Sequence, residues 1–154
     1  MEMPLDPVLA NLPAMPLVRG AGIESAREAI RAANVSDSAR AGLYLRAGFW
    51  DEAHNLAQDI ASADGSYWHA IVHRQEPDAG NASYWFRRVG AHAIFPDLAT
   101  RAAQIEPSLT GSWDPYRFID YCERASRQTG SETERRAIAI QQIEWELLFE
   151  HCSA

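Results

Sequence analysis

The near absence of period-two alternation constrains the fold of this chain more than any other feature of its sequence. Valine and threonine, which favour strands, are sparse, whereas alanine and arginine, which favour helices, are abundant. Apolar residues recur instead at helical spacing along most of the chain. A length of 154 residues suits one domain with its own hydrophobic core. The sequence therefore predicts a single all-α domain.

Caps and helix-breaking residues divide the chain from residue 23 onward into about eight short helices. Ser36, Ser66 and Asp114 are the expected N-caps of the second, fourth and seventh helices. The tight turn at Gly48 and the turn over residues 76–81 make two successive antiparallel helix hairpins. The expected helices cover residues 23–33, 36–48, 50–61, 66–76, 81–89, 96–106, the segment after 114 and the segment after 131.

The first 22 residues are expected to form an extended arm, because four prolines remove backbone donors and disfavour helix. These prolines and two acidic residues interrupt any signal-peptide core, and no segment approaches the roughly 20 apolar residues that span a bilayer. Residues 23–154 form the expected domain, and a cytoplasmic location is expected.

Charge and composition exclude several classes of function. The net charge of -7 argues against a nucleic-acid-binding or membrane-binding protein, which would show a basic face. All 14 basic residues are arginine, so lysine chemistry is excluded. The chain has no phosphate-binding glycine loop, and its two cysteines suggest no disulfide framework. No organic cofactor is predicted, which leaves a divalent metal ion as the cofactor to consider.

The last expected helix begins with the capping box Ser131–Glu134 and carries apolar residues on more than one side. Such a helix either lies at the centre of the domain or docks a partner, which could be a second copy of the chain. Its acidic residues are expected to form a solvated face: Glu144, Glu146 and Glu150.

Residues 65–95 contain the densest chemistry, with imidazoles, aromatic rings and guanidinium groups close together. These side chains build ligand pockets, and arginine would hold a carboxylate or phosphate group. The alternative is that the rings form core and the arginines form structural ion pairs. The candidate ligand-binding residues are Trp68, His69, His73, Tyr84, Arg87 and Arg88.

A metal site is a further candidate in this segment. His69, His73 and Glu76 follow one another at i, i+4 and i+7, so they share a helix face and could hold one metal ion. His92 would add a ligand if the chain folds back. Alternatively, these imidazoles make hydrogen bonds inside a packed hairpin. His54 lies in the string D-E-A-H, which also occurs in helicases. Because the chain has no phosphate loop and no lysine, this match is interpreted as chance.

Residues 40–92 resemble tetratricopeptide-type and Sel-type helical repeats. The segment AGLYLRAGFWDEAHNLAQDI places Gly48 at an inter-helix turn, and GNASYWFRRVG is similar to a closing repeat helix. Gly48 and Gly80 are 32 residues apart, close to the repeat length of about 34. The run over residues 65–90 is also similar to small microbial proteins of no assigned activity. The repeat resemblance implies a scaffold or a peptide-binding module and not an enzyme.

Two functional hypotheses follow. The first is a cytoplasmic helical-repeat-like protein that binds a peptide partner or a small anionic ligand in the His, Arg and aromatic groove. The alternative is a metal-dependent enzyme of hydrolase type that uses the His69, His73 and Glu76 face. A third class, a purely structural protein, would act through its apolar last helix.

Overall fold

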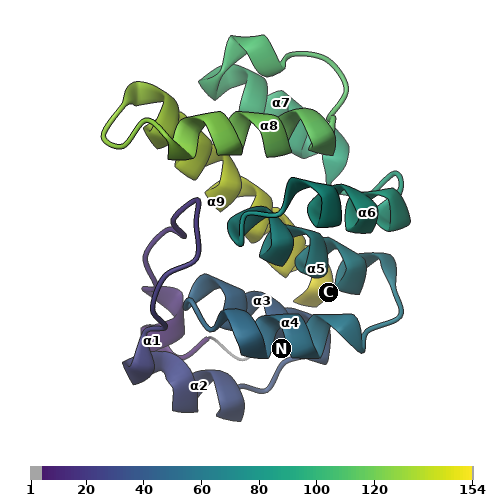
Figure 1. Ribbon diagram of the computed structural model, residues 1–154. Helices are drawn as coiled ribbons and strands as arrows, with labels where there is room; N and C mark the ends of the chain where they lie inside the picture. The colour runs from purple at the N-terminus through teal and green to yellow at the C-terminus, as the bar shows by residue number, and fades with distance from the viewer. Residues whose placement is uncertain (1–4, 154) are drawn as a thin grey trace.

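A computed structural model describes residues 5–153, whose regular structure is entirely helical (Figure 1). The all-α prediction is confirmed, and the helices form one domain. Nine α-helices and two short 3-10 helices occur within the described residues. The α-helices are α1 (Pro7–Ala10), α2 (Arg27–Ala32), α3 (Asp37–Arg46), α4 (Trp50–Gln58), α5 (Ala63–Gln75), α6 (Ala79–Val89), α7 (Phe95–Ile105), α8 (Pro115–Ser126) and α9 (Glu132–Ser153), and the 3-10 helices are η1 (Glu24–Ala26) and η2 (Pro107–Leu109).

Most helix starts follow from local capping. Ser36 Oγ accepts from the backbone N–H of Ala39, and Asp114 caps α8, so both predictions are confirmed. The predicted cap Ser66 is wrong, because Ser62 caps α5 one turn earlier and Ser66 lies inside the helix. Two serines four residues apart offer equivalent local caps, and the helix begins after the first of them.

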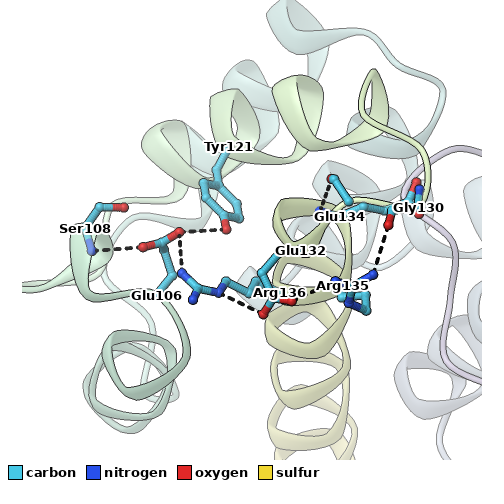
Figure 2. Close-up of polar contacts among 9 residues, drawn as sticks. Glu106, Ser108, Tyr121, Gly130, Glu132, Glu134, Arg135 and Arg136 are labelled. Atoms are coloured by element: carbon cyan, nitrogen blue, oxygen red, sulfur yellow. Dashed lines mark hydrogen bonds and ion pairs between the residues drawn. The ribbon is translucent and has the colours of Figure 1, made fainter.

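The capping box before α9 forms only in part. Ser131 Oγ accepts from the backbone N–H of Glu134 at 3.1 Å, as predicted. The carboxylate of Glu134 accepts from the backbone N–H of Gly130 rather than that of Ser131 (Figure 2). The carboxylate still satisfies a free donor at this helix N-terminus, one residue earlier than in the standard motif.

Helices α3, α4, α5 and α6 pack in chain order, each against the next. Gly48 lies in the turn between α3 and α4 with φ of +85°, a conformation that side chains with a Cβ rarely adopt. Helices α7 and α8 lie at the other end of the molecule, and α9 runs between the two halves (Figure 1). The two expected pairs of neighbouring helices, α3 with α4 and α5 with α6, are therefore present.

A carboxylate joins the three helices α7, α8 and α9. Glu106, which follows α7, accepts from Tyr121 Oη at 3.0 Å and lies 3.4 Å from Arg136 Nη1 (Figure 2). Its second oxygen accepts from the backbone N–H of Ser108 at 3.3 Å. These contacts fix the turn after α7 against the first turns of α9.

Helix α5 lies at the centre of the fold, and every residue from Gly65 to Gln75 is buried. It packs against α3, α4 and α6, and its side chains reach α9. A helix that is covered on all sides has no solvated face on which to place its polar residues. His69, His73 and Arg74 are therefore held inside the protein, where each needs a partner.

Arg74 finds its partner on α9. Its guanidinium donates to both carboxylate oxygens of Glu144, at 2.6 and 3.2 Å, and also to Gln141 Oε1. Tyr67 Oη donates to Glu144 at 2.8 Å. Glu144 is fully buried, so the prediction that it belongs to a solvated face is wrong. Its burial depends on an arginine 70 residues away in the chain.

The apolar residues of α9 are used inside the domain. Trp145 and Leu148 are buried, and Trp145 Nε1 donates to the backbone oxygen of Gly42 at 2.8 Å. Glu146 and Glu150 are exposed, as predicted. Of the two roles expected for this helix, the central one accounts for its buried residues.

The N-terminal segment packs along the domain and is not wholly extended. Helix α1 lies within the predicted arm, residues 1–22, whose first four residues are outside the described part. Leu12 and Met15 are buried, and Gln141 donates to the backbone oxygen of Met15. Within residues 5–153, no helix combines the length and the apolar character that crossing a membrane requires.

Candidate functional site

Three imidazoles converge between α4 and α5. His69 and His73 are four residues apart on α5 and share one face, and the packing of α4 on α5 brings His54 opposite them. One possible ligand atom from each of the three lies within 4.8 Å of the others. The ring centroids are 4.7 Å apart for His54 and His69, 5.3 Å for His54 and His73, and 5.0 Å for His69 and His73. These three residues are called the three-histidine cluster below.

His54 is not among the ligands predicted from the sequence, where the D-E-A-H string that contains it is interpreted as a chance match. The spacing of residues in the sequence nevertheless indicated where His54 points. Trp50 precedes His54 by four residues and Ala57 follows it by three, so His54 lies beside the apolar stripe of its helix. That position directs its side chain toward the helix that α4 covers.

Two tryptophans enclose the three-histidine cluster. Trp50 stacks on His54 with centroids 5.3 Å apart, and Trp85 of α6 stacks on His69 at 3.8 Å. Trp50 is held in place by its Nε1–H, which donates to the backbone oxygen of Val72 at 2.8 Å. Aromatic walls limit the access of water and lower the local dielectric, which strengthens the bond of an imidazole to a cation.

His69 is held neutral by its surroundings. It is 3% exposed, and burial, followed by the nearby His54 and His73, lowers its pKa from 6.5 to about 4. Its Nδ1 is buried and has no hydrogen-bond partner among residues 5–153. A neutral imidazole has one nitrogen with a free lone pair, which is the form that binds metal ions.

Glu76, predicted as a ligand beside His69 and His73, lies behind His73 instead. Its Oε1 is 3.4 Å from His73 Nδ1. A proton on Nδ1 shared with this carboxylate leaves the lone pair of His73 on Nε2. Carboxylates occupy this position behind many metal-ligating histidines, where they orient the ring and increase its basicity. Glu76 therefore suits an outer role.

His92 belongs to a second group, with Asp64 and His151, and does not join His69 and His73 as the sequence suggested. His92 Nε2 lies 2.7 Å from Asp64 Oδ1, and the backbone N–H of Ile94 donates to His92 Nδ1 at 3.2 Å. Because Nδ1 accepts, the proton of the neutral ring is on Nε2 and is donated to Asp64. Both ring nitrogens are thus used, and His92 ties the loop before α7 to the start of α5.

The six candidate ligand-binding residues do not share one surface. Trp68 is fully buried, with its ring against Gly42 and 6.3 Å from the ring of Trp145, so it contributes to the core and not to an open groove. Tyr84 is 45% exposed, and two further members on α6 are also exposed, Arg87 and Arg88. His69 and His73 alone of the six lie in the three-histidine cluster.

No model of a protein family matches the chain, and no curated protein or solved structure is significantly similar to it. The resemblance of residues 40–92 to tetratricopeptide-type repeats consequently stays a proposal.

The low pKa of His69 predicts a loss of stability in acid. The unfolded imidazole binds a proton near pH 6.5 and the folded one only near pH 4, so acidification between these values favours unfolding. In the presence of a chelator, we expect the free energy of unfolding to fall by about 3 kcal/mol over this range because of His69. Urea denaturation of the wild type and His69→Gln at several pH values measures this. Equal pH slopes for the two proteins would contradict it.

Proposed function

We propose that this chain binds a divalent transition-metal ion at the three-histidine cluster, and that zinc suits its donors best. The observation that carries the proposal is the convergence of three imidazoles, one of which has a buried nitrogen with no hydrogen-bond partner in the described part of the chain. A buried polar atom without a partner costs about 1–3 kcal/mol, and coordination of a metal would remove that cost. Neutral imidazole nitrogens are good ligands for zinc, copper, iron and nickel.

The activity that such a centre supports is metal-assisted hydrolysis. Three histidines leave one position of a tetrahedral zinc ion open, which is the composition of a catalytic site and not of a closed structural one. A zinc ion held there would supply a Lewis acid and activate water. His54 is half-buried, so the cluster is less enclosed on its α4 side than at His69 and His73. Glu76 would orient His73 through the contact at Nδ1.

Zinc titration against a competing chelator tests the metal site. The wild type is expected to bind one zinc ion tightly at the cluster, and His54→Ala and His73→Ala each remove a ligand. We expect either variant to lose more affinity than the roughly 10–100-fold that the loss of an outer hydrogen-bond partner costs. His151→Ala is the matched control, because that imidazole lies outside the cluster. Equal zinc affinity in all four proteins would rule the site out.

Hydrolysis is tested separately with an activated ester. Zinc-loaded wild type is expected to accelerate its hydrolysis, and removal of zinc or the substitution His73→Ala should abolish the acceleration. Tight zinc binding without any acceleration would restrict the proposal to a metal-binding protein.

A second proposal is a cytoplasmic helical-repeat module of the tetratricopeptide type that binds a peptide. The successive packing of α3 to α6 supports the repeat, free Cys122 and Cys152 suit a reducing compartment, and exposed Arg87 and Arg88 could contact an acidic partner. A peptide selected against the protein in the presence of chelator should lose binding with Arg87→Ala or Arg88→Ala. It should keep binding with His73→Ala. The opposite pattern would exclude this proposal.

A further inference from the structure

Arg88 is linked to the three-histidine cluster through a single tryptophan ring. Its guanidinium carbon lies 5.3 Å from the ring centroid of Trp85, and the same ring stacks on His69 with centroids 3.8 Å apart. Trp85 and Arg88 are three residues apart on α6, so they lie on one side of that helix. The arginine therefore stands beside the same aromatic wall that encloses the cluster.

The N–H donors of the Arg88 guanidinium are available to bind a ligand. Its side chain is exposed, and it forms no ion pair or side-chain hydrogen bond with the residues that the structure describes. Contact with the face of Trp85 leaves its N–H donors available, because the ring engages only the charge. Arg87 is two residues from Trp85, and a helix turns by about 100° per residue, so Arg87 lies on the opposite side of α6 from Trp85.

Tyr84 completes the surface around Trp85. Its ring packs edge-on against Trp85 with centroids 5.2 Å apart, and it is 45% exposed. Tyr84 and Arg88 are four residues apart and share a face of α6. An exposed aromatic ring and an arginine without an ion pair among residues 5–153 therefore share a helix face beside the indole that contacts His69.

We infer that the ligand of the three-histidine centre is a small molecule with an anionic oxygen group, which Arg88 binds. The inference rests on the proposed metal site, because it assigns the anionic group to a ligand whose other end lies at the metal. A planar fork of N–H donors matches the oxygens of a carboxylate or a phosphate. A divalent metal ion would add two positive charges near Arg88 and so attract an anion locally, although the net charge of the chain is -7.

Calorimetric titration of the zinc-loaded protein with inorganic phosphate and with benzoate tests the inference. Arg88→Gln is expected to weaken the binding of whichever anion the wild type binds by about tenfold or more, the usual effect of losing a charge-assisted hydrogen bond. Arg101→Gln is the matched control, because that exposed arginine lies on α7 and pairs with Asp97. Zinc affinity, measured on the same three proteins, should be the same.

The possible outcomes distinguish failure of this inference from failure of the proposed metal site. Binding of phosphate alone would identify a phosphate group as the anion, and binding of benzoate alone a carboxylate. If the protein binds stoichiometric zinc and the wild type and Arg88→Gln bind the anion equally well, the inference is overturned and the metal site stands. The same holds if the zinc-loaded protein is saturated by neither phosphate nor benzoate. Failure of the wild type to bind zinc would overturn both.

Discussion

Replacing Glu144 by leucine is expected to destabilise the protein by about 3–5 kcal/mol, because Arg74 would remain buried without its counter-charge. Both side chains are almost completely inaccessible, and the guanidinium donates to both carboxylate oxygens. Tyr67 would lose its acceptor at the same time. A buried charge left alone costs far more than an exposed ion pair contributes. Urea denaturation at pH 7 measures the change.

Two further variants decide whether burial of the charge is the cause. Glu146→Leu removes an acidic residue two positions along α9, where it is exposed, and should change the stability by less than about 0.5 kcal/mol. The double variant Arg74→Met/Glu144→Leu should recover much of the lost stability, since no buried charge remains. A double variant that is as unstable as Glu144→Leu would contradict this explanation.

Gly42→Val is expected to destabilise the protein by about 3 kcal/mol, through overpacking against Trp68. A Cβ atom at Gly42 would lie 2.6 Å from Trp68 Cζ2 and 2.7 Å from Cη2, well inside van der Waals contact. The ring cannot yield easily, because Trp68 is fully buried. The backbone of α3 is also held, since Trp145 donates to the carbonyl oxygen of Gly42. Thermal and urea unfolding should both report the loss.

Gly80→Val provides the matched control for this substitution. Gly80 also lies in a helix, but the nearest atom to an added Cβ is Asp78 Oδ1 at 3.7 Å, an ordinary contact. The change there should lie within about 0.5 kcal/mol of zero. A similar loss of stability at both glycines would show that the helical context, and not the contact with Trp68, is responsible.

Local signals predicted the helices well, and tertiary contacts explain the errors. Ser36 and Asp114 cap helices through bonds that span three residues or fewer, so their sequence neighbourhood was sufficient. Ser62 and Ser66 offer the same local cap, so the sequence could not show which of the two serines begins α5. Glu144 appeared solvated for a similar reason, since the arginine that makes its burial tolerable lies on another helix.

Only the part of the candidate site that lies on one helix could be predicted from the sequence. The spacing of His69 and His73 placed both on one face of α5, and the structure has them there. His54 joins them because α4 packs on α5, which no motif in the sequence encodes. His92 was expected nearby, yet Asp64 and the backbone of Ile94 occupy its two nitrogens. Residue types indicated the chemistry, and only packing decided which imidazoles meet.

Anomalous diffraction at the zinc absorption edge, from crystals of the protein loaded with one equivalent of zinc, tests the metal site most directly. We expect one dominant peak enclosed by His54, His69 and His73, about 2.0–2.1 Å from one nitrogen of each. Full occupancy of zinc elsewhere, at Asp64 and His151 or on the surface, with no peak among these three imidazoles, would contradict it.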